Sequence, residues 1–91
     1  MSRLDEADVA AGLRRTPGWE RTGAGITRAY RFRDFREALA FVNRVGDLAE
    51  RAGHHPDIDI RYNSVTLALT THDAGGLTQK DFDLAHAIDA A

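Results

Sequence analysis

Hydrophobic residues recur along the chain with two periods, one typical of helices and one typical of strands. Three segments carry apolar stripes at helical spacing, and four shorter segments alternate apolar with polar residues. In chain order the predicted elements are a helix at 2–14, strands at 19–21 and 26–32, a helix at 34–52, strands at 57–62 and 65–71, and a helix that begins at Thr78. Each strand pair has a short connection, which predicts two hairpins and a mainly antiparallel sheet. We therefore predict a two-layer α+β domain, with three helices on one face of a four-stranded sheet.

Local signals support several of these boundaries. Three residue pairs have the spacing of a helix capping box: Ser2 with Asp5, Asp34 with Glu37, and Thr78 with Asp81. Gly53 is the expected left-handed residue after the second helix. Asn63-Ser64 is the expected two-residue turn of the second hairpin.

Apolar residues of the second helix cover about half of its circumference, more than the ~100° that a single core contact requires. Two interpretations remain open. The helix is either set deeply into the core of its own chain, or Phe41 and Leu48, at one margin of the apolar arc, face a partner subunit.

Composition narrows the class of protein. The 91 residues predict a single domain spanning residues 1–91, and 43% of them are hydrophobic, which is ordinary for a globular domain. The net charge is −2 and no basic run is interleaved with aromatic residues, so nucleic-acid binding is not expected. No apolar stretch approaches the ~20 residues of a membrane helix. Without cysteine or a secretory signal pattern, the chain is expected to be cytoplasmic.

Three histidines are predicted to converge at one end of the second hairpin. His54 and His55 precede its first strand, and His72 ends its second strand. In an antiparallel hairpin the start of the first strand lies beside the end of the second. Histidine is the one side chain whose unperturbed pKa lies near neutrality, so this convergence suggests proton transfer or metal binding.

The residues alone leave three interpretations of this cluster open. The histidines could be capping or surface residues. They could hold a catalytic zinc ion, although adjacent histidines tend to diverge on extended backbone and the chain has no H-x-H or H-x-x-x-H pair. They could also perform metal-free acid–base catalysis, in which a neutral imidazole accepts one proton and an imidazolium donates another.

A longer pattern surrounds the histidines. From Glu50 onward the chain reads E-x3-H-H-P-x5-Y-x9-H-x8-D, which comprises Glu50, His54, His55, Pro56, Tyr62, His72 and Asp81. This pattern resembles the signature of the pterin-4a-carbinolamine dehydratases. The resemblance covers nearly the whole chain and includes Gly18-Trp19, Phe41-Val42 and Gly76-Leu77-Thr78.

The resemblance implies an enzyme that dehydrates 4a-hydroxytetrahydropterin to quinonoid dihydropterin, without a metal or a cofactor. It implies that His54 and His72 are the acid–base groups and that His55 mainly binds and orients the pterin. Glu50, Pro56, Tyr62 and Asp81 are then expected to contribute to substrate binding. General acid–base catalysis of this kind contributes typically ~10²–10⁴-fold.

Two of these residues also suit purely structural positions. Glu50 lies one turn before His54 and is expected to orient a histidine, but it would also suit a solvated helix position. Asp81 sits where helix capping alone would place it.

The chain departs from many family members at two positions. It has Asp57-Ile58 where they have an aromatic residue, which leaves the preferred pterin open. It has Asp73 where they have glutamate after the third histidine. Neither departure touches the three histidines.

The resemblance also implies partners. A homodimer or homotetramer is expected, as is a functional link to an aromatic amino acid hydroxylase that forms the carbinolamine. The alternative is a catalytically idle relative that acts as a binding or dimerisation scaffold.

Overall fold

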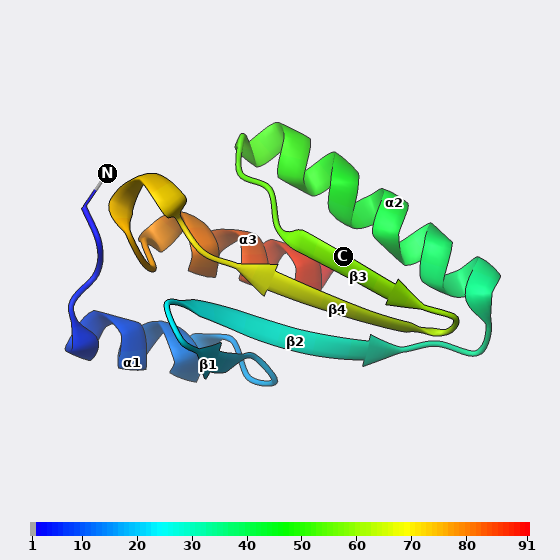
Figure 1. Ribbon diagram of the computed structural model, residues 1–91, viewed down its shortest axis with the longest axis horizontal. Coiled ribbons are helices and arrows are strands. Elements are labelled where there is room, and N and C mark those ends of the chain that lie inside the picture. The colour runs from blue at the N-terminus through cyan, green and yellow to red at the C-terminus, as the bar shows by residue number, and fades with distance from the viewer. Residues whose placement is uncertain (1) are drawn as a thin grey trace.

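The computed structural model describes residues 2–91 and has the predicted α+β architecture (Figure 1). Its elements are α1 (Glu6–Arg15), β1 (Glu20–Thr22), β2 (Gly25–Arg31), α2 (Phe35–Ala52), β3 (Asp57–Arg61), β4 (Ser64–Leu69), the short 3-10 helix η1 (His72–Ala74) and α3 (Gln79–Ala90). The four strands form one antiparallel sheet in the order β1-β2-β4-β3. No helix within residues 2–91 is long and apolar enough to cross a membrane.

The core lies between one face of this sheet and the helices. Alternate residues of β4 supply its centre, where Val65, Leu67 and Leu69 are buried while Thr66 is exposed. Their packing partners from the helices include Val9, Val45, Phe82 and Ile88. This arrangement follows from the two-residue period of a strand, which sends every second side chain to the covered face.

The first helix begins four residues later than predicted. Its N-cap is Asp5, whose side chain accepts a hydrogen bond from the backbone N–H of Asp8 at 2.9 Å. The predicted capping box of Ser2 with Asp5 is therefore wrong. The segment before Asp5 instead runs past the loop that follows β4, where the Leu4 N–H donates to the Leu77 carbonyl at 2.8 Å (Figure 1).

The second hairpin turns one residue earlier than predicted. Arg61 pairs with Ser64, so the two turn residues are Tyr62 and Asn63 rather than Asn63 and Ser64. Tyr62 takes a left-handed φ of 52°, which is uncommon for a bulky residue. Asn63 secures the turn because its side chain donates to the Phe32 carbonyl at 2.9 Å while its own carbonyl accepts from the Phe32 N–H at 2.8 Å.

The residues predicted to bound α2, Asp34 and Gly53, do so, but the predicted capping box is incomplete because the Glu37 side chain accepts from the Arg33 N–H at 3.0 Å instead of from Asp34. The Asp34 side chain accepts from the Glu37 N–H at 2.9 Å, and Gly53 is left-handed with φ 63°. Phe41 is 6% exposed and its ring packs on those of Tyr30 and Phe32, so it belongs to the core of its own chain. The alternative in which Phe41 faces a partner subunit is therefore wrong, whereas for Leu48, which is only partly buried, it stays a prediction.

A cluster around Asp89 ties the last turn of α3 to the sheet. Its carboxylate accepts from the Trp19 indole N–H at 2.9 Å and from the Tyr30 hydroxyl at 2.6 Å. Arg28 lies 3.3 Å from the same carboxylate. Burial, together with the hydrogen bond to Asp89, raises the pKa of Tyr30 above its usual value because both favour the neutral phenol.

Replacing Tyr30 by phenylalanine tests this cluster. At pH 7 we expect Tyr30→Phe to lower the free energy of unfolding by about 1 kcal/mol through the lost hydrogen bond. The raised pKa of Tyr30 stabilises the fold fully below the unfolded tyrosine pKa of about 10, and this stabilisation is lost as the pH rises above that value. Urea denaturation at pH 7 and pH 11 should therefore show a smaller difference between wild type and variant at pH 11. Tyr62→Phe, at an exposed tyrosine, is the control. An equal difference in unfolding free energy between wild type and Tyr30→Phe at both pH values would contradict the raised pKa of Tyr30.

Candidate active site

All three predicted histidines line one surface concavity of about 300 Å³. Thr70, Thr71, Asp73 and Lys80 complete most of its wall. The sheet register explains the convergence, because Asp57 of β3 pairs with Ala68 of β4. Continued by two residues, this pairing brings His55 and Thr70 to the same end of the hairpin. The predicted meeting of the histidines is confirmed, although His72 lies in η1 and not on the strand.

The end of α2 places His54 in this concavity. The left-handed Gly53 allows its own N–H to donate to the Glu50 carbonyl at 3.3 Å and the His54 N–H to donate to the Ala49 carbonyl at 3.2 Å. These two bonds form a Schellman motif, in which the residue after the glycine turns back across the helix end. His54 is therefore held by its backbone as well as by its side chain.

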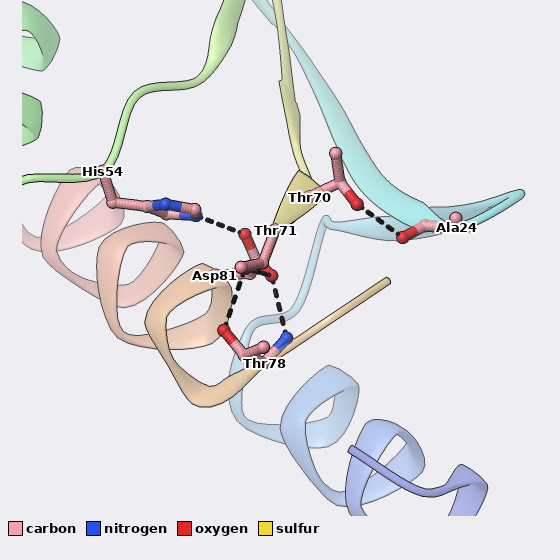
Figure 2. Close-up of polar contacts among 6 residues, drawn as sticks. All are labelled: Ala24, His54, Thr70, Thr71, Thr78 and Asp81. Carbon is pink, nitrogen blue, oxygen red and sulfur yellow. Dashed lines mark hydrogen bonds and ion pairs between the residues drawn. The ribbon is translucent and has the colours of Figure 1, made fainter. Parts of the chain in front are cut away.

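Asp81 is the polar centre of the site. Its carboxylate is fully buried, and donors reach it from three segments of the chain (Figure 2). Oδ2 accepts from the Thr78 N–H at 2.9 Å and from the Thr71 hydroxyl at 2.8 Å. Oδ1 lies 2.5 Å from Nε2 of His54, whose side chain is 11% exposed. Such hydrogen bonds are what a buried carboxylate requires to offset its loss of hydration.

The hydroxyl groups fix the direction of this network. Thr71 donates its single hydroxyl proton to Asp81, so its oxygen accepts from the Thr78 hydroxyl at 2.9 Å. Because an ionised carboxylate only accepts, Nε2 of His54 carries the proton that it shares with Asp81. Nδ1 of His54 is then the ring nitrogen with a free lone pair. Asp81 is thus both the capping-box residue of α3 and the hydrogen-bond partner of His54.

The histidine that lies beside Glu50 is His55. Oε2 of Glu50 lies 2.5 Å from Nε2 of His55, and both side chains are largely exposed, at 77% and 62%. His54 is occupied by Asp81 instead. His55 and Glu50 therefore form a solvated pair at the rim, while His54 and Asp81 form a buried pair behind it.

The turn that carries His72 is closed by backbone hydrogen bonds. Thr71 and Gly76 bond to each other in both directions, at 3.1 and 3.3 Å. A left-handed Gly75 ends the 3-10 turn between them. The histidine side of this turn is exposed, so His72 meets solvent while its neighbour Thr71 reaches inward to Asp81.

Four motif residues do not line the concavity, and two of them, Tyr62 and Pro56, also make no contact with its histidine side chains through a hydrogen bond or ion pair, unlike Glu50 and Asp81. Tyr62 occupies the hairpin turn at the far end of β3 and is 65% exposed, so the structure does not bring it to the histidines of the same chain. Pro56 joins His55 to β3 without lining the concavity. Within residues 2–91, no three histidine, aspartate or glutamate side chains are grouped so that they could hold a metal ion.

Two residues of the site, Thr71 and Thr78, are not predicted from the sequence as partners of Asp81. Capping spacing identifies Thr78 only as the start of a helix. Thr71 directly precedes His72, and the residue that lies opposite it depends on the pairing of β3 with β4, which the predicted turn at Asn63-Ser64 would shift. The correct turn at Tyr62-Asn63 places Thr71 near His54.

Comparisons with known proteins match one family over the described residues. The family model described as "Pterin 4 alpha carbinolamine dehydratase" matches residues 2–91. A protein of Thermomicrobium roseum, provisionally assigned as a pterin-4-alpha-carbinolamine dehydratase, is 59% identical over 97% of this chain and 95% of its own length. A protein of Chloroflexus aurantiacus with the same provisional assignment is 61% identical over 98% of this chain and 96% of its own.

Two solved structures have the same fold. A transcriptional coactivator/pterin dehydratase from Brucella melitensis superposes with a TM-score of 0.93 at 34% identity, over 98% of this chain and 97% of that one. A pterin dehydratase-like protein identified as a RuBisCO assembly factor in the alpha-carboxysome has a TM-score of 0.69 at 22% identity, over 84% of this chain and 90% of that one. The second likeness shows the fold alone.

The left-handed Gly53 provides a test of how His54 is positioned. A Cβ at this residue would meet no atom within 4 Å, so the cost of Gly53→Ala comes from the backbone conformation alone. We expect Gly53→Ala to lower the free energy of unfolding by about 1 kcal/mol, whereas Gly53→Asn should cost less because asparagine tolerates this region. Denaturant unfolding measures both values. An equal loss of unfolding free energy in the two variants would contradict the conclusion that the left-handed backbone at Gly53 causes the cost.

Proposed function

Since this chain belongs to the pterin 4 alpha carbinolamine dehydratase family, we propose that it converts 4a-hydroxytetrahydropterin to quinonoid dihydropterin and water. The observation that carries the proposal is the buried His54–Asp81 pair beside two exposed histidines in one concavity. A pair of this kind orients one imidazole for proton transfer and stabilises the positive charge that it acquires.

The reaction is an elimination that needs one proton donor and one proton acceptor. The bond between C4a and the hydroxyl oxygen breaks, and the hydroxyl leaves as water after receiving a proton. A double bond forms between C4a and the adjacent ring nitrogen, which loses its proton. One proton is donated and one is accepted, so the total charge of the two histidines is unchanged. Each histidine then regains its starting protonation state by exchanging a proton with solvent.

We assign the proton acceptor to His54. Its Nε2 is held by Asp81, which leaves Nδ1 available to take the proton of the ring nitrogen. The resulting imidazolium has the fixed carboxylate of Asp81 at 2.5 Å from its other nitrogen. Because Thr71 and Thr78 hold that carboxylate, the charge is stabilised without rearrangement of the site.

His72 suits the role of proton donor to the leaving hydroxyl. It is exposed on the loop before α3, so it can regain its proton directly from solvent after each turnover. His55, paired with Glu50 at the rim, would bind and orient the pterin ring. The proposal requires no metal and no cofactor.

The proposed substrate also defines the partners. The carbinolamine has to be supplied by an enzyme that hydroxylates with a reduced pterin, such as an aromatic amino acid hydroxylase. A homodimer or homotetramer stays a prediction, supported by the exposed apolar side chains of Phe35 and Leu39 on α2 and Ile58 on the edge strand β3. Sedimentation at micromolar concentration tests it, and a clean monomer would contradict it.

The rival function is a binding protein without catalysis. The Brucella melitensis relative is described as a transcriptional coactivator as well as a pterin dehydratase, so the fold is compatible with a second role. The His54–Asp81 pair supports the enzyme, because helix capping alone explains the buried carboxylate but not its contact with a histidine of an open concavity.

Stopped-flow decay of freshly generated 4a-hydroxytetrahydropterin tests the proposed activity. We expect wild type to accelerate the decay and the double variant His54→Ala, His72→Ala to leave only the spontaneous rate, a loss of about 10²–10⁴-fold. His86→Ala is the matched control, because His86 is the one histidine that does not line this concavity. No acceleration by folded wild type would favour the binding protein.

Asp81 and Glu50 are expected to differ in importance. Asp81→Asn presents an amide that can donate to Nε2 of His54, which favours the wrong tautomer, and we expect kcat to fall by about 10²–10³-fold. Glu50→Gln removes an exposed partner of His55, and we expect mainly a higher KM, with kcat changed by no more than about threefold.

Steady-state rates with the same carbinolamine measure both effects, after circular dichroism has shown that each variant is folded. Equal losses of kcat in the two variants would contradict the division between the buried and the exposed pair.

A further inference from the structure

A second concavity, of about 350 Å³, adjoins the histidine concavity on the other side of His54. It lies between the C-terminal turns of α2 and the first turns of α3. Leu48, Leu84 and Ala87 provide apolar surface, and the charged side chains of Arg51, Lys80 and Asp83 also line it. None of these residues belongs to the motif that identified the site.

Two residues connect the concavities. His54 and Lys80 line both of them, so a molecule bound over the histidines can extend into the second concavity past these two side chains. The linings differ in character. The histidine concavity is lined mostly by polar side chains, which suits a ring rich in nitrogen and oxygen, whereas the second combines aliphatic side chains with charges.

In the second concavity the acidic side chain has a hydrogen-bond partner, whereas the two basic side chains have no ion-pair partner in the described part of the chain. Neither Lys80 nor Arg51 forms an ion pair with a carboxylate of residues 2–91. Asp83, the acidic side chain of the lining, accepts a hydrogen bond from the Gln79 amide at 2.9 Å. Two cations against one carboxylate leave an excess of positive charge beside the aliphatic surface, which complements a carbon chain that carries an anion.

We propose that this concavity is a subsite for the ring substituent of the pterin and that it selects substituents bearing an anionic group, a carboxylate or a phosphate ester. The proposal rests on the proposed function for the placement of the ring over the histidines. Lys80 is the specificity-determining residue, because it borders both concavities and its ammonium can reach an anion on a flexible stem. Arg51 supports it from α2.

The composition of the chain provides a direct probe of this subsite. Lys80 is its only lysine. An amine acylating reagent therefore modifies Lys80 and the terminal amine, and peptide mass mapping separates the two. We expect a dihydropterin with a carboxylate or phosphate substituent to protect Lys80 from acylation, and unsubstituted dihydropterin at equal occupancy of the histidine concavity to protect it less. Equal protection by all three ligands would overturn the proposal.

Kinetics with Lys80→Met provide the second test. We expect its KM to rise by about fivefold to twentyfold for carbinolamines with an anionic substituent. Because Lys80 also borders the histidine concavity, the KM for the unsubstituted carbinolamine can rise as well, but by a clearly smaller factor. Comparing the carboxylate with the phosphate ester identifies which anion is preferred. Arg36→Met removes the same charge from an exposed position of α2 outside both concavities and is the control.

The outcomes separate this proposal from the activity itself. Equilibrium binding of the dihydropterins, followed by their fluorescence, requires no turnover. If wild type fails to accelerate carbinolamine decay but prefers anionic dihydropterins in a manner that Lys80→Met abolishes, the activity is wrong and the subsite stands. If turnover is normal and Lys80→Met weakens every ligand equally or none, the subsite is wrong and the activity stands.

Discussion

The buried carboxylate of Asp81 is the group on which the arrangement of this site depends. Its charge lies away from water, so it has to be satisfied by hydrogen bonds from the protein. Those bonds come from Thr78 at the start of α3, Thr71 in the loop after β4, and His54 beyond the end of α2. One carboxylate thus joins three segments that are distant in sequence, and losing any of these donors would leave part of its charge uncompensated.

This constraint gives the histidines of the concavity different surroundings. His54 is held twice, by the Schellman motif at its backbone and by Asp81 at its ring. His55 and His72 are exposed, one paired with the solvated Glu50 and the other on a short loop closed by the Thr71–Gly76 bridge. The proposed elimination would use this difference, with His54 as the oriented proton acceptor and His72 as the exposed proton donor that exchanges with solvent.

Prediction from the sequence succeeds where the determinant is local. The left-handed Gly53 and the caps at Asp34 and Thr78 depend on a few neighbouring residues, and all three are predicted correctly. It fails where tertiary contacts decide. The helix α1 begins late because the Leu4 N–H is hydrogen-bonded to the Leu77 carbonyl. The hairpin turn is shifted because Asn63 is hydrogen-bonded to Phe32, which leaves Tyr62 in a left-handed conformation that residue preferences disfavour. The motif locates the site, but the pairing of Asp81 with His54, and of Glu50 with His55, depends on the fold.

The most direct test of the central claim uses the four histidines of the chain as internal probes. Long-range 1H–15N spectra of the imidazole rings would be recorded as dihydropterin is added. The account predicts that His54 carries its proton on Nε2 in the free protein, and that the ring signals of His54, His55 and His72 shift together while those of His86 do not. Dihydropterin that shifted His86 alone, or left all four rings unchanged at saturating concentration, would contradict the assignment of this concavity as the pterin site.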